Sequence, residues 1–203
     1  MGDGWRRVSG TIDRLNDWIG TFIRWLTLAM VAVGAYNALA RWATRYTDFA
    51  LTSNALNELQ WYFFSLIFLL GAAYGLNHDV HVRVDVLYSA LSRRARAWID
   101  LFGSILFLLP FCALMLWVSF PAVRYSWNTR EVSPDPGGLP RYPIKAVILL
   151  CFALLLAQGI SQIVKKVYVI RTGEPWGEDQ GLRGEIEGHA RELAEGAGPG
   201  GSG

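Results

Sequence analysis

Four long apolar stretches, separated by charged segments, constrain the fold of this chain more than any other feature of its sequence. Crossing the hydrocarbon core of a bilayer, ~30 Å thick, takes about 20 apolar residues of α-helix. The stretches meet or approach that length and cover about residues 19–40, 58–76, 100–123 and 144–165. Because backbone polar groups find no water inside a membrane, each stretch must satisfy its own hydrogen bonds as a helix. The sequence therefore predicts an all-α integral membrane protein with four transmembrane helices.

The distribution of charge supports this class. Hydrophobic residues make up 52% of the 203 residues and charged residues 18%, yet the charges gather at the chain ends and between the apolar stretches. A soluble domain would instead place charges along one face of each helix. The net charge of +2 is dispersed over these segments and offers no basic patch for nucleic acid. Several Trp residues fall near the expected helix ends, as indole rings favour the membrane–water boundary: Trp18, Trp25, Trp42, Trp61, Trp98 and Trp127.

The Lys and Arg residues predict the orientation of the helices. Those in segments 1–24, 83–96 and 165–171 share one side of the membrane and outnumber those in segments 41–45 and 124–145 on the other. Since the side richer in Lys and Arg faces the cytoplasm, both termini are expected there. Removal of the first stretch as a signal peptide, after the Ala-Leu-Ala that ends it, is an alternative. The preceding region is long, mixed in charge and itself patterned as a helix, which favours retention.

Two shorter segments have the pattern of amphipathic helices lying on a membrane surface. In residues 1–18 and about 83–97, apolar residues recur every three or four positions and polar or basic residues fill the other face. This pattern suits an interface with anionic headgroups, and it equally suits packing on a partner protein. We expect lipid-headgroup contacts from four arginines in or near these segments: Arg24, Arg93, Arg94 and Arg96.

Two further segments have the composition of loop or tail. The connection from Ser133 to Pro140 is rich in proline and glycine, which predicts an extended, turn-rich loop. Pro143 is expected in the first turn of the fourth helix, where its missing N–H costs nothing. Residues 167–203 are acidic and Gly-rich, and they hold too little apolar surface to fold alone, so we predict a disordered tail.

Motifs for catalysis or cofactor binding are absent from the sequence. It has no phosphate-binding loop, nucleophile elbow or His-Glu zinc pattern, and no histidine lies within an expected span to hold a haem. We interpret His78 and His81 as solvated residues at the membrane interface rather than metal ligands. Cys112 and Cys151 lie in apolar stretches and are interpreted as small apolar fillers. We therefore predict that this chain is not an enzyme and binds no cofactor or metal.

Ionisable residues inside a membrane are costly and often mark functional sites. Here Glu58 and Asp100 stand at the start of the expected second and third helices, where negative charge complements the helix dipole. Solvated helix ends and ion pairs with a partner are both compatible with these positions. The helix middles offer few polar side chains: Asn37, Ser65, Ser104 and Gln158. The pattern favours a scaffold that packs against another membrane protein over a carrier that encloses a solute path.

Four blocks of this sequence resemble the small permease subunit of tripartite ATP-independent periplasmic (TRAP) transporters. They are Asn57–Tyr62 at the start of the second helix, His81–Asp85 after it, Leu91–Asp100, and Glu131–Arg141 in the Pro/Gly loop. The similarity covers about residues 15–166, and the loop is similar to the branch labelled for mannitol or chloroaromatic compounds.

The resemblance implies two partners for this chain. One is a large permease subunit that carries the substrate and sodium sites, and the other is a periplasmic protein that binds the substrate, an organic acid. The chain would be a stationary scaffold in the bacterial inner membrane, with its 124–143 loop as a candidate contact for the binding protein. By analogy, six residues are candidates for contacts that order the subunit interface: Glu58, Gln60, Trp61, Arg83, Asp85 and Asp100.

Two other functions remain open at this point. A self-sufficient small transporter working as a homodimer would need charged residues near the bilayer midplane. A membrane anchor subunit of an enzyme complex would need ligands or a nucleophile at membrane depth.

Overall fold

A computed structural model of the chain describes residues 3–46, 53–78, 91–173 and 176. Within these residues the structure is helical apart from its loops, and four helical segments are long and apolar enough to cross a membrane. This confirms the predicted all-α transmembrane class. The helical elements are α1 (Asp3–Thr44), α2 (Asn54–Asn77), α4 (Arg93–Gly103), a π-helical turn (Ser104–Leu108), α5 (Leu109–Asn128) and α6 (Tyr142–Thr172).

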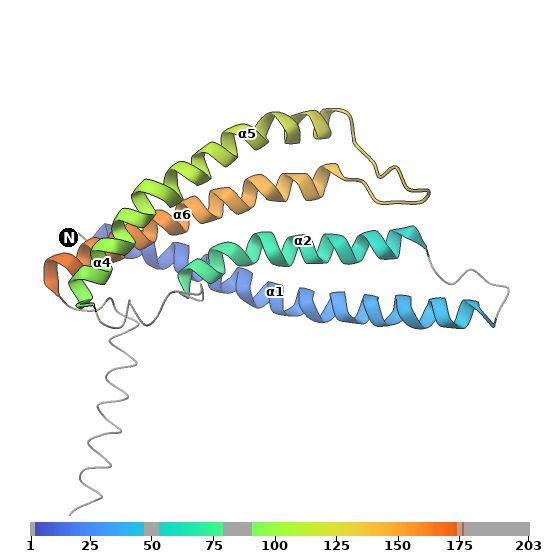
Figure 1. Ribbon diagram of the computed structural model, residues 1–203, viewed down its shortest axis with the longest axis horizontal. Helices are drawn as coiled ribbons and strands as arrows, with labels where there is room; N and C mark the ends of the chain where they lie inside the picture. Colours follow the sequence, from blue (N-terminus) through green and yellow to red (C-terminus); the bar gives the residue numbers. More distant parts are fainter. Residues whose placement is uncertain (1–2, 47–52, 79–90, 174–175, 177–203) are drawn as a thin grey trace, which may run out of the picture.

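The helices form two hairpins that lie side by side (Figure 1). One hairpin pairs α1 with α2, and the other pairs α6 with the continuous segment made by α4, the π-helical turn and α5. Helix α6 is central, because it packs against α1, α2, α4 and α5. Of its most apolar stretch 33% is buried, against 11–17% in the other three spans. We call the end where α2 and α6 begin the hairpin-loop end, and the opposite end, where α1 begins and α6 finishes, the terminal end.

The apolar core lies where α1, α2 and α6 meet. Ile19, Leu70 and Leu154, one from each helix, are buried together. Close approach of α1 to α2 depends on Gly20, since a Cβ there would overlap the ring of Tyr74. Small residues at such crossings let membrane helices gain van der Waals contact, which replaces the hydrophobic effect as the source of association in lipid.

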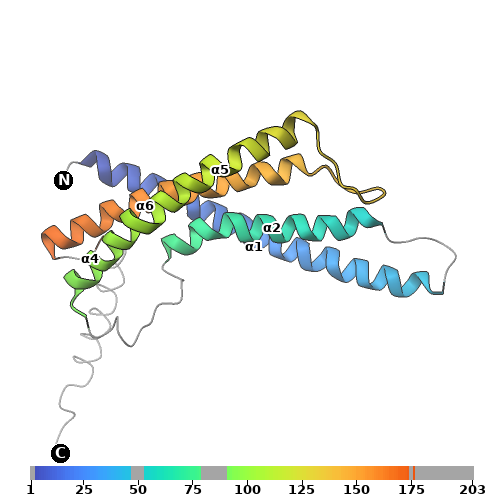
Figure 2. The same ribbon diagram turned by 45° about the horizontal axis from the view of Figure 1, so that its top comes forward.

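Helix α1 differs from the expectation of a separate surface helix over residues 1–18. It runs unbroken from Asp3 to Thr44, because no proline or glycine-rich break separates the amphipathic segment from the apolar stretch. Figure 2 shows its first turns crossing α6 at the terminal end. Polar Ser9 and Asn16 are buried on α6, whereas apolar Trp5 and Val8 are exposed. Contact of this exposed face with a membrane surface stays a prediction.

The third span begins earlier than predicted. Ser92 caps α4 by accepting a hydrogen bond from the backbone N–H of Ala95 at 3.3 Å, and the helix continues to Asn128. Residues 93–97 are therefore its first turns and not the end of a surface helix, while residues 83–90 of that predicted helix lie outside the described residues. The π-helical turn ends two residues before Pro110, whose ring would clash with a carbonyl in a regular preceding α-helical turn.

Helix α6 starts as predicted and ends later than predicted. Pro143 lies in its first turn, which confirms the expectation. The helix extends to Thr172 instead of stopping near residue 166, and Gly173 ends it with a left-handed backbone (φ 74°) whose N–H bonds the carbonyl of Val169 at 2.8 Å. The predicted tail thus loses its first residues to α6, and apart from Gly173 and Trp176 the rest of it lies outside the described residues.

Candidate functional site

Three successive turns of α2 bind the Pro/Gly loop at the hairpin-loop end. Glu58 accepts hydrogen bonds from the hydroxyl of Ser133 and, at 2.5 Å, from the backbone N–H of Leu139. One turn earlier, Asn54 donates to the carbonyl of Pro136 at 3.1 Å. One turn later, the hydroxyl of Tyr62 donates to a second proline carbonyl of the loop, at 2.6 Å. Positions four apart share one face of a helix, so α2 presents these side chains as a row that ties one hairpin to the other.

The loop itself is shaped to receive Glu58. It is turn-rich as predicted, with one isolated antiparallel bridge between Val132 and Pro140 and a left-handed Gly137 at φ 72°. At Gly138 an added Cβ would lie 2.5 Å from the Ser133 Cβ and 2.8 Å from the Glu58 carboxylate. Glycine is therefore needed at this position for the loop to lie against α2.

An ion pair holds the base of the loop. The ammonium of Lys145, in the first turn of α6, donates to the carboxylate of Glu131 at 2.5 Å. This hydrogen bond is the largest cause that holds the pKa of Glu131 below its usual value. The carboxylate is therefore charged at neutral pH and fixes the loop to the start of α6.

Polar side chains also join α1 to α2 at this end. The amide of Asn37 donates to Asn57 at 2.7 Å and to Gln60 at 3.3 Å, and Arg41 donates to Asn57 at 2.7 Å. Gly34 leaves the space that Gln60 occupies, because an added Cβ would lie 2.6 Å from its amide nitrogen. Gln60, a predicted interface residue, thus has a partner inside its own hairpin.

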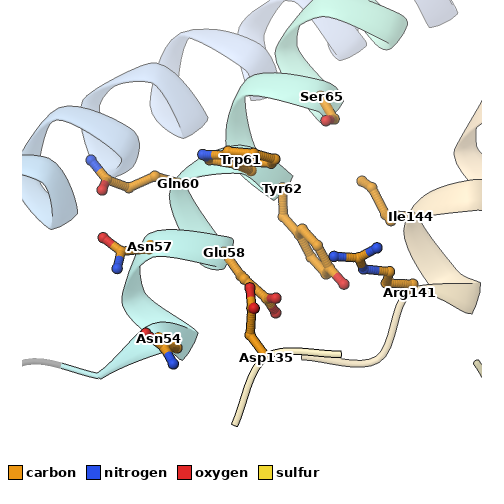
Figure 3. Close-up of a pocket in the computed structure, with 10 residues that line it drawn as sticks. All are labelled: Asn54, Asn57, Glu58, Gln60, Trp61, Tyr62, Ser65, Asp135, Arg141 and Ile144. Carbon is orange, nitrogen blue, oxygen red and sulfur yellow. The ribbon is translucent and has the colours of Figure 1, made fainter. Parts of the chain in front are cut away.

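A cavity of about 550 Å³ opens between the two hairpins beside Glu58 (Figure 3). Its walls come from α2, the loop and the start of α6, and they carry the charged groups of Glu58, Asp135 and Arg141. Trp61 lies along one side of it, and 74% of this residue is exposed. The mixture of two carboxylates, a guanidinium and an indole can bind polar groups of a partner.

The terminal end contains a buried polar network centred on Gln158 of α6. Its amide nitrogen donates to Asp13 at 3.1 Å and to Asn77 at 2.8 Å, and its oxygen accepts from Asn16 at 2.6 Å. Lys165, two turns further along α6, pairs with Asp13 at 2.9 Å. One side chain of α6 therefore links α1 and α2 at once.

This network is the main feature that sequence reasoning missed. Gln158 was noted only as one of a few polar residues in the helix middles. Its partners follow a recognisable pattern, because Ser9, Asp13 and Asn16 recur every three or four residues along α1. Ser161 and Lys165 continue the same face of α6. Two matching polar faces on separate helices are the signal that could have indicated the contact.

Asp100 has a position different from the one predicted. It lies inside α4 rather than at the start of a helix, because α4 begins at Arg93. Its carboxylate pairs with Lys166 of α6 at 2.7 Å, and the side chains are only 16% and 20% exposed. The residue joins two helices of its own chain, and a contact with another subunit stays a prediction.

The structure describes only some of the remaining residues predicted to contact a partner or lipid headgroups. Arg83 and Asp85 lie outside the described residues, and the side chain of Arg93 is not described. Arg24 donates to the hydroxyl of Thr21 at 2.8 Å and is exposed.

Two of the predicted headgroup contacts are described near the start of α4. Arg94 is exposed, and Arg96 donates to the carbonyl of Leu91 at 3.0 Å. Their lipid contacts stay predictions. In the part of the chain that the structure describes, no three metal-ligating side chains gather into a site.

Comparison with known proteins decides the family. The family described as "Tripartite ATP-independent periplasmic transporters, DctQ component" matches residues 30–168, more than half of the chain. The chain belongs to this family. The resemblance inferred from the sequence is thereby confirmed, while the mannitol or chloroaromatic branch stays a prediction. No curated protein and no solved structure matches the chain. The residues matched to the DctQ component include Glu58, its loop partners Ser133 and Leu139, and the central Gln158.

Proposed function

We propose that this DctQ component is the small membrane subunit of a sodium-coupled, binding-protein-dependent transporter for organic acids, where it acts as a fixed scaffold for a large permease. Membership of the family makes the chain a small membrane component of a TRAP transporter. Sodium coupling, the organic acid and the scaffold role go beyond that and are the content of the proposal. We also expect no catalysis and no cofactor in this chain.

One observation carries the scaffold role: polar side chains tie the two hairpins together at both ends. Glu58 binds the α5–α6 loop at the hairpin-loop end, and Gln158 binds α1 and α2 at the terminal end. Breaking the buried contacts of Gln158 in lipid leaves polar groups without water to replace them. The hairpins are therefore held in one arrangement, which suits a static support more than a moving carrier.

The outer faces of the helices suit packing against a second membrane protein. Large apolar side chains cover them, among them Trp25, Phe68 and Trp117, each at least 68% exposed. Lipid covers part of such a surface, and we assign the remainder to the large permease. This support is physical complementarity alone.

We further propose the bacterial inner membrane as the location, with both termini in the cytoplasm. The excess of Lys and Arg in segments 1–24, 83–96 and 165–171 supports this orientation. The hairpin-loop end then faces the periplasm, so the cavity beside Trp61 and the 124–143 loop are candidate contacts for the binding protein. Labelling of a single cysteine at Arg130 by a membrane-impermeant reagent in intact spheroplasts tests the orientation.

Reconstitution in liposomes tests the transport role. Vesicles would hold this chain, the large permease, or both, and uptake of a labelled organic acid would be measured with the binding protein outside and an inward sodium gradient. We expect uptake only with both membrane chains, and none when sodium is equal on the two sides. Uptake by this chain alone would instead establish the homodimeric transporter, and sodium-independent uptake would remove the coupling.

A crosslink between the hairpins tests the scaffold role separately. Asn54→Cys and Pro136→Cys place thiols on α2 and on the loop, whose Asn54 amide and Pro136 carbonyl lie 3.1 Å apart in the unmodified chain. The buried Cys112 and Cys151 are replaced by Ala in this background. A short bifunctional thiol reagent then locks the hairpins. A scaffold keeps its transport rate after crosslinking, whereas a subunit whose hairpins move during transport loses it.

A further inference from the structure

An apolar groove of about 300 Å³ lies between α1 and α6, beside Leu70 of α2. Leu15, Trp18 and Phe22 of α1 form one wall, and Leu150 and Leu154 of α6 form the other. The lining presents no polar surface. Trp18 and Phe22 stack with their ring centroids 6.4 Å apart, which makes this wall flat. At membrane depth such a groove is shaped for a hydrocarbon chain.

The acidic residues of α1 near this groove have partners within the chain, whereas two nearby basic residues are exposed to the surroundings. Asp13 pairs with Lys165 at 2.9 Å, and Asp17 contacts His78 at 2.8 Å, so both carboxylates are engaged within the chain. Arg7 and Arg14 are exposed, and among the described residues no carboxylate pairs with either of them. The folded chain thus leaves positive charge on the outside of α1.

The spacing of the two arginines puts them on the stripe of α1 that carries Trp18 of the groove wall. Arg7, Arg14 and Trp18 are separated by seven and four residues, so they share one stripe of the helix. With a rise of 1.5 Å per residue, Arg14 lies about 6 Å and Arg7 about 16 Å beyond Trp18 along the axis. Trp18 is 67% exposed, and its indole lies between the charges and the apolar wall, as indoles do at the membrane–water boundary.

We propose that this groove is a binding site for an anionic phospholipid. One acyl chain lies against the apolar walls, and the phosphodiester accepts hydrogen bonds from Arg7 and Arg14. Basic residues at the mouth of a gap between membrane helices are the usual recognition device for anionic headgroups. A transmembrane helix of a partner could cover the groove as well, but an apolar helix leaves both guanidinium charges without a counter-ion. A phospholipid satisfies the groove and the charges together.

Native mass spectrometry of the purified full chain tests this site. The probes are phosphatidylglycerol and phosphatidylethanolamine with identical acyl chains, titrated separately in a mild detergent. We expect the wild-type chain to bind phosphatidylglycerol more tightly. Each arginine near an anionic lipid contributes about fivefold in affinity, so Arg7→Gln/Arg14→Gln lowers binding of phosphatidylglycerol roughly 30-fold. Binding of phosphatidylethanolamine falls by a smaller factor, because its ammonium already neutralises the phosphodiester that the arginines contact. Arg45→Gln/Arg124→Gln is the matched control, since it removes two exposed arginines distant from the groove.

A second variant separates the acyl-chain contact from the charge. Leu150→Trp fills the groove and is expected to weaken binding of both lipids, with both arginines in place. Equal affinity of the wild-type chain for the two lipids, or an equal loss in the control variant, overturns the proposal. So does loss of the bound phosphatidylglycerol when the large permease is added, because that result assigns the groove to a partner helix.

Discussion

Replacing Gln158 by leucine probes the polar network at the terminal end. The side chain is fully buried and makes three hydrogen bonds, to Asp13, Asn16 and Asn77. Leucine keeps much of the volume but leaves these groups facing an apolar neighbour. Asp13 and Asn77 retain Lys165 as a donor, whereas the Asn16 amide loses the one partner found for it among the described residues.

The size of the effect follows from these contacts. Hydrogen bonds between membrane helices average about 0.6 kcal/mol, so losing three costs about 2 kcal/mol. Leaving the buried Asn16 amide unsatisfied adds about 1–2 kcal/mol. We therefore expect Gln158→Leu to lower the free energy of unfolding by about 3–4 kcal/mol. For a chain of this size, that corresponds to a fall in Tm of roughly 6–15 °C.

Thermal unfolding in detergent, followed by intrinsic Trp fluorescence, measures this difference. Gln162→Leu is the matched control, since Gln162 is nearly as buried, one turn further along α6, and donates one hydrogen bond, to the carbonyl of Leu76 at 3.2 Å. Its expected loss is about 1 kcal/mol or less. If Gln158→Leu unfolds at the same temperature as Gln162→Leu, the network does not join the hairpins and the reasoning is wrong.

Three further changes test other contacts. Gly138→Ala forces a Cβ into the space between the loop and α2, so we expect faster hydrogen exchange of the loop amides by mass spectrometry. Because the Lys145 hydrogen bond lowers the pKa of Glu131 below 4.5, its stabilisation is complete above that pH and is lost as pH falls through the lowered value. The difference in Tm between the wild-type chain and Glu131→Gln should therefore be constant near neutral pH and vanish in acid. A double-mutant cycle of Asp100→Asn and Lys166→Gln should show a coupling energy of about 1 kcal/mol.

Each of these three tests has a result that would contradict it. Gly103→Ala is the control for Gly138→Ala, since an added Cβ there meets nothing within 4 Å, and equal exchange in both variants would show that the loop has room. A Tm difference for Glu131→Gln that persists unchanged into acid would show that charge is not the source of its stabilisation. Additive effects in the cycle would show that Asp100 and Lys166 do not interact in solution.

The candidate residues show how far local sequence can predict a site. Glu58 and Asp100 are candidates for subunit contacts by analogy with the family and because charge near a span is costly. The structure gives each a contact within its own chain, and the contacts with another subunit stay predictions. Their partners were not predictable, since Ser133 lies 75 positions from Glu58 and its approach depends on the space left by Gly138. Gln158 taken alone is a single amide in an apolar helix, and its partners are indicated only when the polar face of α6 is compared with that of α1.

Local sequence by itself determined the four membrane-spanning helices and the family. Hydropathy over about 20 residues is a local property, and the lack of water in a bilayer leaves the backbone no choice but helix. The tertiary structure alone decided where helices begin, which faces meet and which charges remain outside. Asp13 turns inward to Lys165 while Arg14 stays exposed, because the rotation of α1 is set by its contacts with α2 and α6. Those contacts join residues as far apart as Ser9 and Ser161, 152 positions along the chain. The polar faces that meet are therefore recognisable only when separate helices are compared with each other.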